Sequence, residues 1–415
     1  MKLRQMTSRT FVSLRVRNFR LYFIGQGISI SGTWMQSVAL GWLVVSFAHF
    51  SPIDLGITIA LPFLPMLLFG PFGGVVVDRS DKRKVLYTTQ SVAGLLALAL
   101  GILVTTHHVA LPAIWAVAAL LGMVNLFDNP ARQSFVQEMV GKDLLPNAVS
   151  LNSALINMGR IIGPALSAVL IASISIAACF FVNAASYVAV IIALALMRRA
   201  EIARIRTVER AKGQVRAGLR YAWGHREIRN VLTAVTVVGM FAFNFTVTLP
   251  IFVKSVLHGT ATDYAFVTCA FGFGAVLGGL YVAHRSRPTR PLLTSLAVGF
   301  GALMAVVALA PSVLVTCVAL VPMGFASLAF VSTANTTLQL HSAEEMRGRV
   351  MSLYAMGFLG TTPIGALLIS VIIDASSARV ALGVGAVATV AAGVFLWLTM
   401  REPSSVTLAA SVARA

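Results

Sequence analysis

Long apolar stretches dominate this chain and constrain its fold more than any other feature. About 20 apolar residues cross the core of a bilayer, and twelve stretches of that kind follow one another here. Charged residues make up only 11% of the chain, against roughly 25% in a soluble protein, so a soluble fold would lack the charge to cover its surface. We predict an all-α polytopic membrane protein with twelve transmembrane helices, at 19–47, 52–77, 85–106, 111–131, 147–172, 175–197, 229–254, 263–284, 290–310, 313–340, 348–373 and 380–400.

Positive charge lies almost entirely on one side of these spans. Of the 32 Lys and Arg residues, 29 fall at the termini and in alternate connections, two fall on the opposite side, and Arg160 lies inside a span. Lys and Arg next to spans stay in the cytoplasm, so both termini are predicted to be cytoplasmic. The net charge of +18 therefore reflects membrane topology, and no nucleic-acid partner is expected.

The chain divides into two halves at its one long polar connection. The predicted parts are a cytoplasmic segment (1–18), a six-helix bundle (19–197), a cytoplasmic amphipathic linker (198–228), a second six-helix bundle (229–400) and a cytoplasmic tail (401–415). The halves also share a local pattern, because 51–54 (SPID) opens the second span and 260–263 (TATD) opens the eighth, each with the residues of a capping box. Such repeats are typical of transporters, whose substrate sites lie near the midplane between the repeats.

Three motifs resemble those of the major facilitator superfamily. The segment 74–84 (GVVVDRSDKRK) follows the second span and is similar to the superfamily signature G-x-x-x-D-R-x-x-R/K-R/K. In the fifth span, Gly159, Gly163 and Pro164 resemble the antiporter signature of drug exporters; the glycines allow close helix approach and the proline bends the backbone. The segment 128–133 (DNPARQ) after the fourth span resembles the branch containing the enterobactin exporter. The resemblance implies two pseudo-symmetric six-helix bundles, which is the major facilitator fold.

The resemblance also implies a gate on the cytoplasmic side. Asp78 would face the N-terminus of the eleventh span, where the helix dipole stabilises an anion, and Lys82 or Arg83 would pair with Asp128. These contacts would latch the halves together in the outward-open state. The alternative is that the basic residues only keep this loop in the cytoplasm. The expected gating residues are Gly74, Asp78, Arg79, Lys82, Arg83, Asp128, Gly159, Gly163 and Pro164.

Arg160 lies near the middle of the fifth span, where an unpaired cation costs between roughly 2.5 and more than 10 kcal/mol. Two interpretations stay open: Arg160 binds an anionic or polar substrate, or it is a structural pin that donates to carbonyls or to amides such as Asn125 and Asn157. Other polar residues fall in spans one, four, seven and ten, which the resemblance places around the cavity; each is equally compatible with a helix–helix hydrogen bond. The predicted substrate-cavity residues are Arg160, Gln26, Ser29, Thr33, Gln36, Asn125, Asn244, Thr248 and Ser327.

The 14 acidic residues are all predicted to lie in loops or near helix ends. Carriers that move protons often use a buried carboxylate, and the candidates for proton coupling are Asp54 and Asp128. Asp54 is also expected to cap its helix. Proton coupling is thus implied by the resemblance and only weakly supported by these residues.

No catalytic constellation, phosphate-binding loop or metal-ligand spacing is present in the sequence. We therefore expect no enzyme, no cofactor and no metal site. The expected protein is a monomeric secondary transporter of a bacterial cytoplasmic (inner) membrane that exports an amphipathic small molecule, such as a drug, a siderophore or a secondary metabolite, in exchange for protons. The alternatives are uptake of an organic anion, with Arg160 as its counter-ion, and a non-transporting receptor or scaffold.

Overall fold

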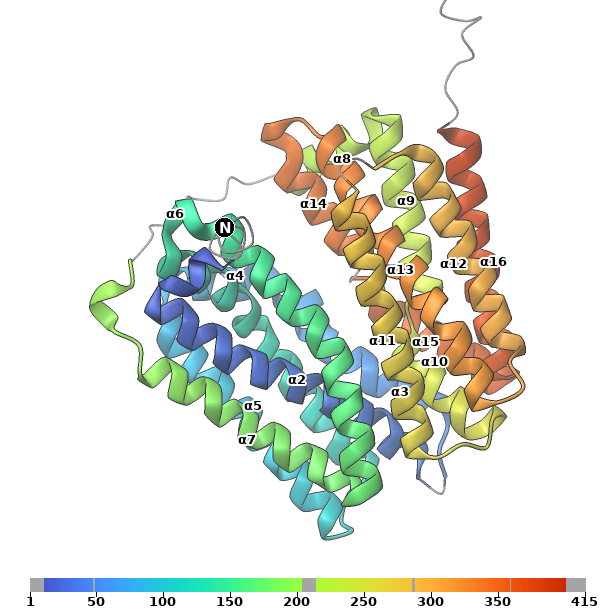
Figure 1. Ribbon diagram of the computed structural model, residues 1–415, viewed down its shortest axis with the longest axis horizontal. Helices are drawn as coiled ribbons and strands as arrows, with labels where there is room; N and C mark the ends of the chain where they lie inside the picture. The colour runs from blue at the N-terminus through green and yellow to red at the C-terminus, as the bar shows by residue number, and fades with distance from the viewer. Residues whose placement is uncertain (1–10, 48, 204–213, 286–287, 359, 401–415) are drawn as a thin grey trace, which may run out of the picture.

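The computed structural model describes residues 11–47, 49–203, 214–285, 288–358 and 360–400, and every regular element in these ranges is a helix (Figure 1). The remaining residues, which include the predicted tail and part of the predicted linker, lie outside the described ranges. The N half comprises η1 (Val12–Arg15), α2 (Arg17–Val45), α3 (Pro52–Ala60), η2 (Leu61–Phe63), α4 (Leu64–Arg79), α5 (Lys82–Thr105), α6 (Leu111–Ser173), α7 (Ile176–Ala195) and η3 (Arg199–Glu201).

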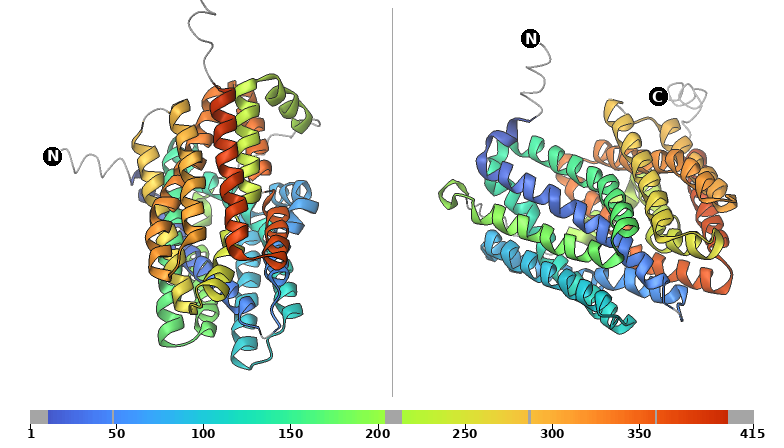
Figure 2. Two further views of the ribbon diagram at one scale, coloured as in Figure 1. Left: turned by 90° about the vertical axis from the view of Figure 1, so that its right-hand side faces the viewer. Right: turned by 60° about the horizontal axis from the view of Figure 1, so that its bottom comes forward.

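The C half begins after a short connecting helix, α8 (Gln214–Gly224), which packs on α9 and α14. Its α10 ends in a π-helical turn, η4 (Phe252–Val256). Figure 2 shows this half from its outer side, with α16 (red) beside α9 (yellow-green). Its elements are α9 (Arg226–Phe241), α10 (Phe245–Ile251), α11 (Ala261–His284), α12 (Arg290–Leu309), α13 (Val313–His341), α14 (Glu344–Phe358), α15 (Thr362–Ala375) and α16 (Ala378–Thr399).

Eleven continuous helical segments of the described chain are long and apolar enough to cross a membrane. One of them, α6, has 63 residues and a length of about 95 Å at 1.5 Å per residue, which is enough for two crossings. It is interrupted at Gly141, whose φ of 72° and ψ of −179° only glycine adopts without strain. The twelve predicted spans are therefore present. The predicted end of the fourth span at 131 was too early, because the helix continues through Pro130 to Gly141.

The two halves meet at one end of the molecule and diverge at the other. Figure 1 shows them close together where α3, α10 and α15 lie and apart where α8 and α14 lie. At the closed end, α3 packs on α15 and α2 on α10, and the rings of Trp42 and Tyr264 stack with centroids 6.1 Å apart. Ser51 Oγ donates a hydrogen bond to Asp374 Oδ1 at 3.3 Å across the same boundary. The molecule thus has a closed end and an open end.

Both predicted capping boxes are confirmed. At the start of α3, the backbone N–H of Ser51 donates to Asp54 Oδ2 at 2.9 Å. At the start of α11, the backbone N–H of Thr260 donates to Asp263 Oδ2 at 2.7 Å, and the N–H of Asp263 donates to Thr260 Oγ1 at 3.3 Å. Equivalent helices of the two halves therefore begin with the same local hydrogen bonds, as expected of a repeat.

Candidate functional site

A polar cavity of about 350 Å³ lies on the inner side of the N half. Its walls come from α2, from both crossings of α6 and from α7. Asn125 and Asn129 are exposed on it, so the cavity is accessible to solvent. The lining residues are Tyr22, Ile30, Thr33, Trp34, Ser37, Asn125, Asp128, Asn129, Arg132, Asn152, Ile156 and Tyr187.

An ion pair between Asp128 and Arg132 forms one wall of this cavity. The two residues are one helical turn apart on α6, and Arg132 Nε donates to Asp128 Oδ2. The other carboxylate oxygen of Asp128 accepts hydrogen bonds from Thr89 Oγ1 at 2.6 Å and Gln90 Nε2 at 2.8 Å, both on α5. Arg132 also donates to Gln26 Oε1 on α2. The Asp128–Arg132 pair thus joins α6 to α5 and α2, and the charge of the carboxylate is neutralised inside the bundle.

This pair corrects two predictions. Asp128 was expected near a helix end, but it lies well inside α6 and is only 3% exposed. Sequence analysis also placed Arg132 among the loop cations and assigned it no role. Both errors arose because the fourth span was ended at 131, whereas α6 continues past Pro130. Membrane helices tolerate such a proline because neighbouring groups satisfy the freed backbone atoms. The four-residue spacing of Asp128 and Arg132 was the signal that could have found the pair.

The predicted partners of Asp128 bind elsewhere in this conformation. Lys82 Nζ lies 3.6 Å from Glu138 Oε1, and Arg83 Nε donates to the backbone oxygen of Leu194 at 2.9 Å. The pairing of Lys82 or Arg83 with Asp128, predicted for the outward-open state, is absent from this conformation and stays a prediction for the other one. Asp128 lies ten residues before Glu138 on α6, which is about 15 Å along the helix. Lys82 and Arg83, at the start of α5, lie at the level of Glu138, so their side chains do not reach Asp128.

The other predicted gate residues at the end of α4 are partly buried, and the two halves lie apart on this side of the molecule. Asp78 ends α4 in the N half, and α4 and α14 lie apart in Figure 1. The backbone oxygen of Asp78 accepts a hydrogen bond from Lys82 Nζ at 3.1 Å. Gly74 is buried and Arg79 is exposed. The structure therefore holds the gate residues together without the latch across the halves.

Only some of the predicted cavity residues line the cavity. Thr33 and Asn125 do so, whereas Gln26, Ser29 and Gln36 are at most 7% exposed and point into the N half. The face of α2 that borders the cavity carries Ile30, Thr33, Trp34 and Ser37, about one residue round the helix from the predicted stripe. Gln36 instead accepts a hydrogen bond from Asn183 Nδ2 on α7 at 2.6 Å.

The three predicted cavity residues of the C half are buried among its helices. Asn244 donates to Met240 O at 2.7 Å, Thr248 to Asn244 O at 3.0 Å and Ser327 to Gly324 O at 2.8 Å. None of the three lines the polar cavity. Each donates to a carbonyl three or four residues earlier, and small polar groups of this kind pack readily between membrane helices.

Arg160 lies on the second crossing of α6, where its guanidinium carbon is 5.3 Å from the centroid of the Trp34 ring. Its Nε atom is buried and has no hydrogen-bond partner among the described residues. The predicted amide partners are otherwise occupied or distant: Asn157 donates to Ser153 O at 2.9 Å, and no bond joins Arg160 to Asn125 in the described structure. A structural pin on these amides is therefore not present.

The glycine motif positions Trp34 against α6. A Cβ atom at Gly163 would lie 2.4 Å from Trp34 Cβ, and one at Gly159 would lie 3.2 Å from Trp34 Cδ1 and 2.6 Å from Ile30 Cγ2. The two glycines therefore let α2 approach α6 closely, as the sequence predicted. Pro164 follows them inside the same helix and is buried.

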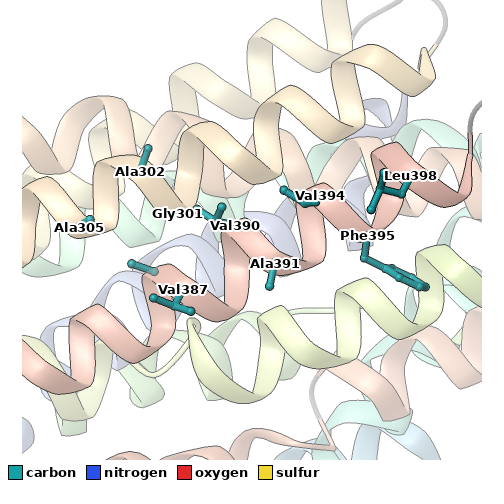
Figure 3. Close-up of a pocket in the computed structure, with 10 residues that line it drawn as sticks. Gly301, Ala302, Ala305, Val387, Val390, Ala391, Val394, Phe395 and Leu398 are labelled. Carbon is teal, nitrogen blue, oxygen red and sulfur yellow. The ribbon is translucent and has the colours of Figure 1, made fainter.

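The outside of the C half carries a larger cavity of a different kind. It measures about 590 Å³ and lies between α12 and α16, where Gly301, Ala305, Val390 and Phe395 are among its walls (Figure 3). All of its side chains are apolar. It offers no side-chain hydrogen bond to a polar substrate, whereas the polar cavity of the N half, which we take as the candidate site, does.

The two six-helix halves, the single closed end and the polar cavity define a membrane transporter of the major facilitator superfamily. Within it, the chain belongs to the transmembrane secretion effector family, whose model matches residues 8–413.

Its relatives include bacterial transporters of two kinds. The staphyloferrin A transporter of Staphylococcus aureus is 25% identical over 86% of this chain and 89% of its own length. The multidrug efflux pump Tap of Mycolicibacterium fortuitum is 25% identical over 83% and 87%. A solved structure of a bacterial homologue of the human lysosomal transporter Spinster, inward-facing and unoccupied, superimposes with a TM-score of 0.69 at 13% identity, covering 92% of this chain and 95% of the other.

Proposed function

We propose that this protein is a proton-coupled exporter of an amphipathic small molecule in a bacterial cytoplasmic membrane, working by alternating access. The observation that carries the proposal is the Asp128–Arg132 ion pair, with its carboxylate buried, in the wall of the polar cavity of the N half. The relatives support export, because one is named as a multidrug efflux pump. The name of another, a staphyloferrin A transporter, supports a small organic substrate.

The open end is proposed to face the cytoplasm. α2 begins there and α16 ends there (Figure 1). The cations Arg20, Arg198, Arg290 and Arg347 belong to helix ends on this side, and such residues remain cytoplasmic. On this proposal both termini lie in the cytoplasm, and the described conformation would admit substrate from inside the cell.

Asp128 is the proposed proton carrier. Its carboxylate is held by Arg132, Thr89 and Gln90, so binding a proton would remove the charge that keeps these groups together. Arg132 would then keep only Gln26 of its two partners. Because the network joins α2, α5 and α6, its loss changes the packing of the N half, which is how proton binding can bias one conformation over the other. Asp54 is committed to its capping box and is the weaker candidate.

Accumulation in cells tests the function. Ethidium, a siderophore and an organic acid are each measured in cells with and without the protein, before and after the proton gradient is collapsed. Lower accumulation that depends on the gradient is expected for at least one of them. Higher accumulation would mean uptake. Unchanged accumulation of every compound, in cells that hold correctly inserted protein, would favour the receptor or scaffold alternative.

A further inference from the structure

We propose that Arg160 and Trp34 form an anion-binding subsite, so that the substrate is an amphipathic organic anion. This inference rests on the proposed transport function and specifies its substrate class. Arg160 differs from other arginines of this protein in its hydrogen-bond partners.

Two arginines that have no acidic partner among the described residues, Arg83 and Arg379, are bound by backbone oxygens. Arg83 donates to Leu194 O at 2.9 Å, and Arg379 donates to Ala308 O at 2.6 Å and Ala310 O at 3.1 Å. Arg160 has no hydrogen bond and no ion pair among the described residues. Its one electrostatic contact there is the cation–π contact with the Trp34 ring. A structural cation would be expected to resemble Arg83 or Arg379. Arg160 instead has no partner for its donors among the described residues.

The charge around the cavity favours an anion. Asp128 is neutralised by Arg132, so these two groups add no net charge to the wall. Arg160 lies one helical turn beyond the lining residue Ile156 and adds a positive charge at the edge of the cavity, whose lining otherwise holds only this neutral pair as charged residues. A cationic ligand would meet a repulsive field, whereas a carboxylate would supply the missing counter-ion and accept charge-assisted hydrogen bonds.

Arg160 lies on the same face of α6 as the cavity lining. Asn152 and Ile156 line the cavity, and Arg160 follows Ile156 by one helical turn on that face. Trp34 lines the cavity and also lies under the guanidinium. If the anionic group of a ligand binds Arg160, its apolar body would therefore lie against Trp34, Ile30 and Ile156. Its polar groups would face the side-chain amides of Asn125, Asn129 and Asn152. These surroundings fit an amphipathic molecule.

The subsite also lies at the boundary between the halves. A Cβ atom at Gly272 of α11 would be 2.4 Å from the backbone oxygen of Arg160, and Cys269 Sγ lies 3.9 Å from Ile161 O. α11 of the C half therefore packs directly against the turn that carries Arg160. A ligand bound there can respond to the movement of one half against the other.

Three matched probes test the charge preference on the purified protein: naphthoate, naphthamide and naphthylmethylammonium, which share one aromatic body and differ in charge. Binding to the folded state raises the unfolding temperature. Naphthoate, present at about 10 mM, is expected to stabilise the wild-type protein more than the other two. Equal stabilisation by all three, or none by naphthoate, would overturn the proposal.

Variants then locate the site. Arg160→Gln is expected to weaken naphthoate binding about ten- to a hundredfold, the usual value of a hydrogen bond to a charged group, while Arg160→Lys keeps part of the affinity. Arg220→Gln removes an exposed charge on α8 and should leave binding unchanged. Naphthoate affinity that is the same in Arg160→Gln and wild type would overturn the assignment.

The two proposals fail in different ways. If Arg160→Gln loses anion binding but wild-type cells show no gradient-dependent export of any compound, the subsite stands and the transport proposal fails. If wild-type cells export only cations, and Arg160→Gln exports them equally well, the transport proposal stands and the anion subsite fails.

Discussion

The two halves of the molecule repeat one helical plan but bury different chemistry. All the buried charged side chains of the described residues, Lys82, Arg83, Asp128 and Glu138, belong to the N half. The interior of the C half is aromatic instead: Phe243 contacts Phe300 and Phe358 with ring centroids 5.5 and 4.9 Å apart. The difference fits the proposed function, in which the N half would hold the groups that respond to ligand or proton and the C half would supply a packed body that moves against them.

The largest effect is expected at Asp128. Asp128→Asn leaves the partly buried Arg132 without its carboxylate. This should cost about 1.5–3 kcal/mol of stability, as for a lost hydrogen bond to a charged group, and gradient-driven transport should be lost. The double variant Asp128→Asn with Arg132→Gln should recover most of the stability and none of the coupled transport. Thermal unfolding and transport in proteoliposomes measure both. Coupled transport by the double variant would refute the role of the pair and remove the functional difference between the halves.

A methyl group at the closed end is expected to have the next largest effect. A Cβ atom at Gly56 would lie 2.3 Å from Ser370 Oγ, across the boundary between α3 and α15. Gly56→Ala should disfavour closure by about 1–3 kcal/mol, or roughly five- to a hundredfold.

Labelling measures this opening. Ser37→Cys, in a protein without its natural cysteines, should react faster with an impermeant maleimide added outside the cell when Gly56→Ala is present. Gly70→Ala in the same span, where no atom lies within 4 Å of the new Cβ, is the control. Equal rates in both variants would show that this contact does not hold the end closed.

The cytoplasmic loops of the two halves provide the third comparison. The first carries Asp78 before Arg79, and its counterpart carries His284 before Arg285. If Asp78 pairs with the helix N-terminus at α14 in the other conformation, Asp78→Asn should slow transport by about two- to thirtyfold, as expected for a loss of 0.3–2 kcal/mol. Substrate affinity should change little. His284→Ala should leave the rate unchanged, and an equal loss in both variants would argue against a latch that only the first loop provides.

A smaller effect is expected in the aromatic interior of the C half. Phe245 contacts Phe243, Phe271 and Phe300. Phe245→Leu should cost roughly 1–3 kcal/mol of stability through lost aromatic pairs, while the protein that remains folded transports normally. Unfolding temperature and transport per folded molecule separate the two. Loss of transport at unchanged stability would place substrate contacts in the C half.

The smallest effects are expected at the repeated caps. Ser51→Ala and Thr260→Ala should each lower stability by about 1 kcal/mol, since each hydroxyl accepts a backbone N–H at the start of its helix. Ser51 also bonds Asp374 across the closed end, so its variant should additionally favour opening. Equal behaviour of the two variants in the labelling assay would show that the Ser51–Asp374 contact contributes nothing to closure.

Local features of the fold were predictable from the sequence. The helices that cross the membrane, the beginning of the second span at Ser51 and the start of the eighth at Thr260 depend on apolar length and on hydrogen bonds within four residues. The close approach at Gly159 and Gly163 was also predictable, because a missing side chain is visible in the sequence. The end of the fourth span was not, because Pro130 ends a helix in water and need not do so inside a membrane bundle.

The site was predicted only in part. Thr33 and Asn125 line the cavity as expected. Gln26 and Gln36 lie on nearly the same face of α2 as Thr33, but their side chains point into the bundle. A step of one residue turns a side chain by about 100°, so a small rotation of the helix decides which polar group meets the cavity. Spacing along the chain does not fix that rotation. Packing against α6 and α7 does.

The sequence alone determined the class of fold, the sidedness of the charge and the caps, since each follows from transfer of about 20 residues into lipid or from contacts within one helical turn. Tertiary structure decided which charged groups meet. Arg132 binds Gln26, 106 residues away, and Lys82 pairs with Glu138 rather than Asp128. The physical reason is that a buried charge binds whichever partner the packed helices bring within reach, and only the assembled bundle sets those distances.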